Sequence, residues 1–258
     1  FDEWSKLKNF AKEKSIDFMC SVFCNQAIDT LNKMKADYIK IPSGEVTNIP
    51  MLEYLKKFNS NIILSTGMSN FKEIDSAVKI LKNNRLSILQ CSSIYPCPEE
   101  LSGINVIPIL RKKYNLPVGF SDHTLGFNAS IGAIYMGATI IEKHLTFSKR
   151  MYGSDAPFAM EPIDFKNFVF NLRQSWKIKK SVVDKNDTKN YKQMKKVFEK
   201  SIVSSKSLKK GHKICFKDMN FKKPGDGIPA SEYKKVIGKK LKKDVLSDYK
   251  FKIKDFTS

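Results

Sequence analysis

Long apolar runs are absent from this chain of 258 residues. No hydrophobic stretch approaches the ~20 residues that a helix needs to cross a bilayer, so no membrane-spanning segment is expected. The sequence also lacks a charged segment followed by an apolar one at its start, which argues against a signal peptide. The chain begins at Phe1 instead of Met, and this indicates a fragment or a trimmed chain.

Paired cysteine motifs are missing too. The cysteines are odd in number, scattered and free of any CxxC spacing: Cys20, Cys24, Cys91, Cys97 and Cys215. Cys20 and Cys91 fall within or at the end of predicted strands, where cysteine behaves as a small apolar residue. This usage is typical of a reducing compartment and predicts a cytoplasmic protein without a disulfide framework or a thiolate zinc site.

Arginine is scarce although the formal net charge is +20. Such a charge could indicate a nucleic-acid or membrane partner. Arginine, however, is the usual bidentate reader of bases and phosphates. The lysines are spread over predicted helix faces and concentrate after residue 177, without interleaved aromatic residues. We therefore expect a solvated, Lys-rich surface with no nucleic-acid or membrane partner, whose positive field favours anionic substrates.

Short apolar or β-branched runs alternate with amphipathic stretches over the first 177 residues. The pattern predicts strands at 17–22, 38–41, 61–65, 86–90, 117–121 and 139–144. It predicts helices at 4–14, 27–35, 50–58, 71–82, 105–114, 128–136 and 163–177. Regular alternation of this kind indicates an α/β domain with a parallel sheet and right-handed crossovers.

The spacing of these units narrows the architecture. Each strand–helix unit takes about 30 residues, which is the spacing of a (β/α)8 TIM barrel of about 250 residues. Two of the eight units that such a barrel requires have no counterpart among the six predicted strands. The sheet is therefore either open and six-stranded, or a TIM-type barrel lacking its first two strands, and the absence of a start Met favours the second.

The chain changes character after the barrel-like part. Residues 1–177 form the predicted partial barrel, 178–200 a polar, Lys-rich linker, and 201–258 a small β-rich domain with turn signals such as Pro224-Gly225. A weak internal repeat relates residues 207–210, followed by Asp218, to residues 240–243, followed by Asp255. A domain this small is marginal alone, so we expect it to lean on the barrel or on a partner subunit.

Two of the three histidines end consecutive predicted strands. His123 and His144 are separated by one αβ repeat. A single histidine is more simply explained as a satisfied, partly buried ring. Because neighbouring parallel strands end in the same mouth, two matched positions instead favour a divalent-metal site or an acid–base pair.

Hydroxyl groups and one lysine follow the other strand ends. These positions hold Ser21, Lys40, Ser43, Glu45, Ser65, Thr66, Ser92, Ser93, Ser121 and Glu142. Several neutral donors beside one cation are what a phosphate group requires. Ordinary strand-end capping is the alternative explanation for each serine taken alone.

Five barrel motifs and one later motif together resemble the N-acetylneuraminate (sialic acid) synthase family. They are IKIPSGE at 39–45, LSTGM at 64–68, IYP at 94–96, GFSDHT at 119–124 and EKH at 142–144, all in the family's order. The later stretch KKPGDGI at 222–228 is similar to that family's C-terminal SAF (antifreeze-like) domain.

The resemblance implies a TIM barrel plus SAF domain that condenses phosphoenolpyruvate with an N-acylated amino sugar of the N-acetylmannosamine type. The products are a nine-carbon 2-keto sugar acid and phosphate. It also implies a Mn or Mg ion on His123 and His144, which with Glu142 form the catalytic set, and a homodimer that is domain-swapped through the SAF domain. The phosphoenolpyruvate contacts match Ser21, Lys40, Ser43, Glu45, Ser65 and Ser121, and the sugar contacts match Tyr95, Glu142 and Asp155.

Three sites depart from the family pattern, and one of them is Gly153-Ser154-Asp155, which stands where the family usually has Gly-Pro-Asp. Ser93 stands where the family usually has Asn, which shortens a contact to phosphate. Lys223 stands where the SAF motif usually has an Arg that reaches across the dimer to the sugar's acyl group, so bidentate geometry is lost. The family's first two strands and its N-terminal catalytic acid have no counterpart here, so the fragment is expected to be impaired alone.

Three alternatives stay open at this point. A legionaminate or pseudaminate synthase would differ only in the sugar. A Lys-rich nucleic-acid-binding protein on a degenerate barrel would bind mixed oligonucleotides with a steep salt dependence. A catalytically dead barrel could serve as an assembly module, although the intact SDH and EKH motifs argue against it.

Overall fold

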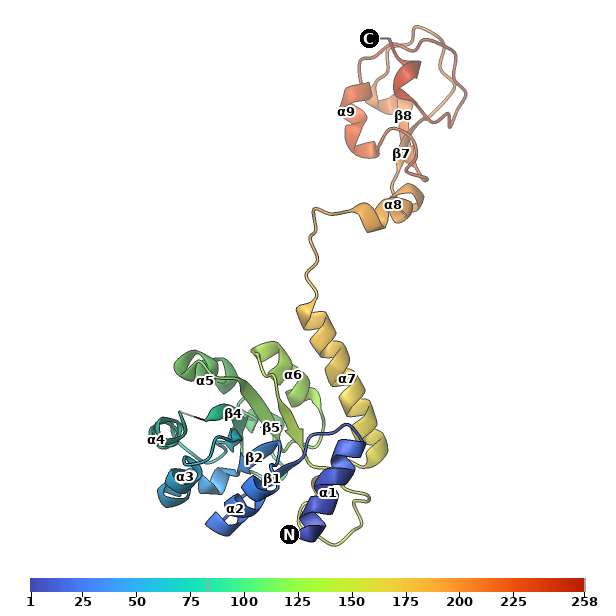
Figure 1. The fold of residues 1–258 in the computed structure, drawn as a ribbon. Helices are drawn as coiled ribbons and strands as arrows, with labels where there is room; N and C mark the ends of the chain where they lie inside the picture. Colours follow the sequence, from blue (N-terminus) through green and yellow to red (C-terminus); the bar gives the residue numbers. More distant parts are fainter. Residues whose placement is uncertain (83, 258) are drawn as a thin grey trace. The chain divides into compact units, whose positions relative to one another are not determined.

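The structure is a computed structural model that describes residues 1–82 and 84–257. The chain divides into two compact units, Phe1–Val182 and Val183–Ser258. Figure 1 shows the strands and helices of the first unit in blue to yellow and those of the second in orange to red. Each unit is described by itself.

The first unit is built on a six-stranded parallel sheet with strands in sequence order. The strands are β1 (Met19–Ser21), β2 (Tyr38–Ile41), β3 (Asn61–Ser65), β4 (Arg85–Cys91), β5 (Val118–Asp122) and β6 (Ile141–Lys143). The predicted parallel α/β fold is confirmed.

The sheet curls into a half-barrel (Figure 1). Lys40 on β2 and Glu142 on β6 lie four strands apart, which in a flat sheet means roughly 19 Å. Their side chains nevertheless meet, with 3.0 Å between Lys40 Nζ and Glu142 Oε1. The curl therefore brings the carboxyl ends of distant strands around one mouth.

Helices connect the strands. They are α1 (Asp2–Glu13), α2 (Asn25–Lys33), α3 (Ile49–Leu55), α4 (Phe71–Leu81), α5 (Val106–Tyr114), α6 (Asn128–Met136) and α7 (Pro162–Lys180). Local chemistry explains several starts. The Asn48 side chain accepts from the Met51 amide at the start of α3, and Asn70 and Glu73 form a reciprocal capping box at the start of α4.

Apolar residues of the sheet and helices share one core. Ile39, Leu64, Ile88 and Phe120 on the strands are almost fully buried against helix residues such as Leu52. Burying a side chain of this size contributes about 1.5–3 kcal/mol. The core therefore stabilises the strands, so that the polar residues at their carboxyl ends are not needed for packing and can form a site.

Strand bounds differ from prediction mainly at the sheet edges. The central strands β2 and β3 have the predicted limits. The predicted 17–22 shortens to Met19–Ser21 and the predicted 139–144 to Ile141–Lys143. Both are edge strands among the described residues, so they pair on one side only, and fewer ladder hydrogen bonds define their ends.

The second unit is a small β-rich fold. It contains α8 (Lys192–Phe198), the antiparallel pair β7 (Ser201–Ser204) and β8 (Met219–Lys222), and α9 (Tyr233–Val236). Its own apolar core includes Ile202, Ile214, Leu241 and Phe251.

The internal repeat of the sequence has a structural counterpart in this unit. Leu208 and Leu241 both enter the core. Asp218 and Asp255 are both buried, and each accepts a hydrogen bond from a backbone N–H three residues earlier, at Cys215 and Lys252. The two halves thus use one buried carboxylate each to fix a turn.

The sequence predicted no membrane-spanning segment and no disulfide framework, and the described residues bear on both points. Among them, no helix combines the length and the apolar character required to cross a membrane. All five cysteines are free thiols.

Candidate active site

A cavity of about 470 Å³ opens at the carboxyl ends of the strands. All of the predicted site residues of the first unit except Glu45 line it: Ser21, Lys40, Ser43, Ser65, Ser93, Tyr95, Ser121, His123, Glu142, His144 and Asp155. Residues that are up to 134 positions apart in the chain therefore share one chamber, because parallel strands end at the same rim.

The His123 ring has a fixed orientation. Its Nδ1 donates to the carbonyl of Ser92 at 2.8 Å, which leaves Nε2, 3.5 Å from Ser121 Oγ, as the nitrogen that carries the lone pair. Burial lowers the pKa of His123, an effect that outweighs the opposing hydrogen bond to Ser92. A neutral imidazole held by a backbone carbonyl is the usual state of a metal-binding histidine.

His144 lies beside His123 at the next strand end. The two ring centroids are 5.4 Å apart, and His144 Nδ1 lies 3.6 Å from an oxygen of Asp155. Tyr95 packs over His123 with 4.1 Å between centroids. Burial, followed by nearby negative groups, raises the pKa of Tyr95 to about 12, so its hydroxyl is a neutral donor at pH 7.

Lys40, Glu142 and Ser121 form a connected polar group across the cavity. Glu142 Oε1 accepts from Lys40 Nζ at 3.0 Å and from Ser121 Oγ at 2.7 Å. Lys40 is 7% exposed, so its ammonium is held largely out of water beside a carboxylate. An ammonium has three donors, so Lys40 retains capacity for a second anion.

Three hydroxyls and a glycine form a tight, polar wall. The Gly67 amide donates to Ser43 Oγ at 2.9 Å. The Oγ atoms of Ser65 and Ser93 are buried and have no protein partner. Buried hydroxyls normally pair, so two unpaired ones in a cavity that also holds Lys40 are suited to an anionic oxygen.

One predicted residue of the first unit, Glu45, is not among those that line the cavity. Glu45 lies in a short turn after β2, where its carboxylate accepts from the Asn48 side chain at 2.6 Å. That hydrogen bond uses one of the two carboxylate oxygens, and the substrate contact of Glu45 stays a prediction. Lys223 belongs to the second unit, where its Nζ lies 4.9 Å from the Phe198 ring centroid.

The cavity also contains residues that sequence reasoning did not assign to it. Phe23, Met68 and Cys91 all line it. Cys91 was interpreted as a small apolar strand residue, but its thiol lies beside the hydroxyls of Ser43 and Ser121, and burial raises its pKa. Its place at the carboxyl end of a buried strand, like that of Ser65, was the signal that could have identified it.

The donor set fits a divalent ion with open coordination positions. His123 Nε2 has a free lone pair and His144 lies beside it, while Asp155 and Glu142 flank the pair. Within the described residues no group of three His, Cys, Asp or Glu side chains converges as a closed site would require. Catalytic metal sites keep at least one coordination position open to water or substrate, and two imidazoles leave several positions open.

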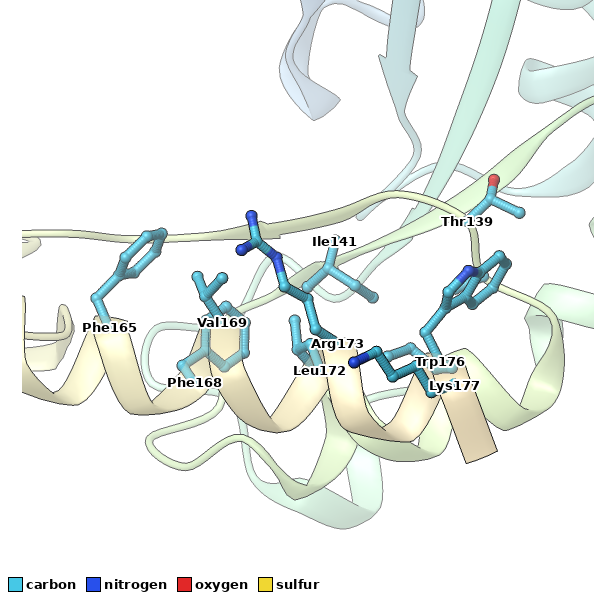
Figure 2. A pocket seen from close by; sticks show the side chains of 11 residues that line it. Thr139, Ile141, Phe165, Phe168, Val169, Leu172, Arg173, Trp176 and Lys177 are labelled. Atoms are coloured by element: carbon cyan, nitrogen blue, oxygen red, sulfur yellow. The ribbon is translucent and has the colours of Figure 1, made fainter. Parts of the chain in front are cut away.

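A second cavity of about 530 Å³ lies along α7 and does not share this chemistry. Figure 2 shows Phe165, Val169, Leu172 and Trp176 projecting from the helix toward the segment that carries Ile141. Its lining is mainly apolar, with Arg173 and Lys177 as its charged members. It is the larger hollow, but the convergent polar groups lie in the strand-end cavity.

Comparisons with known proteins agree with this geometry. The profile of the NeuB family matches residues 1–184, and that of the SAF domain matches residues 199–248. The chain is 36% identical to the N,N'-diacetyllegionaminic acid synthase of Campylobacter jejuni over 92% of this chain and 72% of the relative. It is 30% identical to a pseudaminic acid synthase of the same species over 98% of this chain and 75% of the relative.

A solved structure supports the same relation. The N-acetylneuraminic acid (sialic acid) synthetase of Leptospira borgpetersenii superposes with a TM-score of 0.69 at 29% identity. The superposition covers 75% of this chain and 68% of that one.

Proposed function

This chain belongs to the NeuB family and carries an SAF domain, and from that premise we propose that it is a sugar-acid synthase. The proposed reaction condenses phosphoenolpyruvate with an N-acylated amino sugar of the N-acetylmannosamine type. The products are a nine-carbon 2-keto acid and inorganic phosphate.

One observation carries the proposal: an anion-binding wall and an imidazole pair face the same cavity. Lys40 with the unpaired hydroxyls of Ser65 and Ser93 supplies donors for an anion. His123 and His144 supply the adjoining electrophilic end. A bisubstrate reaction between an anionic enol phosphate and an aldehyde requires both features side by side.

The serine hydroxyls and Lys40 bind phosphoenolpyruvate in this proposal. Ser43 and Ser65 donate to anionic oxygens, and Ser121 does so when its hydroxyl turns from Glu142 to the bound anion, while Lys40 contributes a cation beside them. In the structure Lys40 pairs with Glu142, so a bound anion shares the ammonium with that carboxylate. Pre-arranged donors of this kind hold the substrate without reorganisation during the reaction.

The amino sugar is bound by Tyr95, Glu142 and Asp155 in this proposal. The two carboxylates accept hydrogen bonds from sugar hydroxyls, and the Tyr95 hydroxyl donates because its raised pKa keeps it neutral. His123 and His144 would hold a Mn or Mg ion, which when bound supplies Lewis-acid polarisation of the sugar carbonyl.

The proposed bond changes balance as follows. A carbon–carbon bond forms between C3 of phosphoenolpyruvate and the aldehyde carbon of the open-chain sugar, and the aldehyde oxygen gains a proton. Water adds its oxygen to C2, and the bond between C2 and the phosphate oxygen breaks, so that C2 becomes the ketone carbon. Of the two protons of this water, one balances the proton gained by the aldehyde oxygen and the other leaves with the phosphate. The protein's part is to hold the two reacting carbons together and to exclude competing water.

A second candidate sugar is favoured by the relatives. Identity is 36% and 34% to two N,N'-diacetyllegionaminic acid synthases, against 30% to two pseudaminic acid synthases. It is 26% and 30% to two N-acetylneuraminate-9-phosphate synthases. An amino sugar carrying two acetamido groups is therefore the alternative substrate to test beside N-acetylmannosamine.

The assay is phosphate release from phosphoenolpyruvate with Mn²⁺ and a panel of amino sugars. We expect release that depends on both the sugar and the metal, with the preferred sugar distinguished by its kcat/KM. A panel of mono- and di-acetamido sugars that yields no sugar-dependent phosphate would refute the synthase proposal. Salt-sensitive binding of mixed oligonucleotides in its place would favour the nucleic-acid alternative.

A further inference from the structure

We propose that the buried ion pair Asp122–Lys143 is a positioning pair that fixes the positions and orientations of the two site histidines, His123 and His144. Neither side chain lines the strand-end cavity, and both border a small separate hollow beside His123 and His144. The inference deepens the proposed function, on which it rests for the role of His123 and His144. It concerns residues that hold the site and do not touch the substrate.

The pair is placed by strand alternation. Successive side chains of a strand point to opposite faces, so Ser121 and His123 face the cavity while Asp122 faces away from it. Glu142 on β6 and His144 directly after it face the cavity, while Lys143 between them faces away.

The register completes this arrangement. Asp122 and Lys143 are direct partners across the β5–β6 ladder. Each member of the pair is therefore flanked on both sides by site residues.

The pair is buried and its hydrogen bonds are satisfied. Lys143 Nζ lies 3.2 Å from Asp122 Oδ2, with both side chains at most 2% exposed. Lys143 also donates to the carbonyls of Thr124 and Gly126. Asp122 accepts from the Thr124 amide and hydroxyl, both at 2.8 Å, and from the Ser130 hydroxyl on α6. The backbone on either side of His123 is thus tied to β6 and to α6.

Stability alone does not explain a pair of this kind. Burying two charges costs several kcal/mol in desolvation, and a well-packed neutral pair of similar volume commonly does as well for the fold. What the ion pair adds is direction. Its charge-assisted hydrogen bonds fix where the chain leaves β5 and β6, and hence where both imidazoles point.

The test uses the full chain with the double substitution Asp122→Asn and Lys143→Met. Removing both charges together avoids leaving one of them buried without its partner, so the fold is expected to survive. Three quantities are measured: the urea midpoint, the dissociation constant for Mn²⁺ by calorimetry on metal-free protein, and kcat. The matched control is Asp75→Asn with Lys113→Met, an exposed pair on α4 and α5 with a 3.0 Å contact.

We expect the double variant to stay folded with a lower urea midpoint, because the carbonyls of Thr124 and Gly126 lose the Lys143 donor. Its Mn²⁺ dissociation constant should rise about 10- to 100-fold, the usual effect of losing a partner behind a metal ligand. The control should bind Mn²⁺ like the wild type. A folded double variant that binds Mn²⁺ within threefold of wild type would overturn the proposal, because the pair would then be structural only.

Two further outcomes are also decisive. If the double variant does not fold, Ser130→Ala, which removes one hydrogen bond to Asp122, decides instead. An unchanged Mn²⁺ constant in that variant contradicts positioning, and a rise of threefold or more supports it. If the wild type binds Mn²⁺ but no sugar releases phosphate, the proposed reaction fails while the Mn²⁺ comparison still decides the role of the pair. A wild type that binds no Mn²⁺ overturns both.

Discussion

Gly67 offers the sharpest test of the anion-binding wall, because a single methyl group added there enters it. A Cβ at Gly67 would lie 2.3 Å from Ser93 Oγ, 2.8 Å from Cys91 Sγ and 2.9 Å from Ser43 Oγ. Ordinary contacts of carbon atoms begin at about 3.5 Å. The Gly67→Ala variant therefore has to push Ser93 away by roughly 1 Å and disturb two further side chains.

The expected magnitude follows from these contacts. Overpacking of this kind destabilises a fold by about 1–3 kcal/mol. A misplaced serine also loses a hydrogen bond to a charged group, which is worth about 1.5–3 kcal/mol and corresponds to a loss of roughly 10- to 150-fold in kcat/KM. The loss should fall on phosphoenolpyruvate and leave the KM for the amino sugar nearly unchanged.

Gly44→Ala is the matched control. It adds the same methyl group to the same cavity, but nothing lies within 4 Å of the new atom. Initial rates of phosphate release, measured over a range of phosphoenolpyruvate concentrations at saturating sugar, give the comparison. The reasoning is refuted if Gly67→Ala retains kcat/KM within threefold of wild type, or if Gly44→Ala loses as much.

Three further outcomes are expected. Ser65→Ala should raise the free energy of unfolding by about 1 kcal/mol, since it removes a buried hydroxyl without a protein partner, while raising the KM for phosphoenolpyruvate; urea melts that show a loss of stability would contradict this. His123→Ala and His144→Ala should each abolish stimulation by Mn²⁺, and a variant with full metal-stimulated turnover would rule out its residue as a ligand. In the second unit, burial alone would raise the pKa of Asp218, but hydrogen bonds from His212 and from Cys215 hold it well below the ordinary value. Because the folded pKa is depressed, the stability it contributes is present above about pH 4 and is lost as the pH falls. Hydrogen exchange of the unit's core amides should therefore accelerate between pH 5 and pH 3 after correction for intrinsic rates, and less so in Asp218→Asn; equal acceleration in both would be evidence against it.

Much of the fold followed from the sequence because periodicity reports burial directly. The runs at 38–41 and 61–65 are central strands flanked on both sides, so their apolar patterns end where their ladders end. The edge strands were predicted too long. An apolar residue such as Ile140 can pack beside the sheet although the strand itself, which pairs with a neighbour on one side only, begins after it. Topology followed from the alternation of strands and helices.

The candidate site was predictable at the level of which residues meet, and less so at the level of what they do there. Parallel strand ends converge, so placing Ser121, His123 and His144 together needed no coordinates. That His123 presents Nε2 depends on the position of the Ser92 carbonyl, which no local pattern encodes. The hydrogen bond that draws Glu45 to Asn48 is likewise a matter of turn geometry.

The alternation of in-facing and out-facing residues explains what was missed behind the site. Asp122 and Lys143 belong to the motifs GFSDHT and EKH, yet the sequence assigned them no role. Convergence of parallel strand ends points only to residues that face the cavity, and these two face away from it. Their direct pairing depends on the register between β5 and β6, which is a tertiary property.

The most direct test of the central claim follows C3 of phosphoenolpyruvate through the reaction. Phosphoenolpyruvate labelled with ¹³C at C3 is incubated with the chain, Mn²⁺ and the preferred amino sugar, and the product is examined by ¹³C NMR. The account predicts a labelled methylene carbon bonded to a carbon from the sugar, formed in step with phosphate. A label that appears as the methyl group of free pyruvate would show hydrolysis without condensation, and would contradict it.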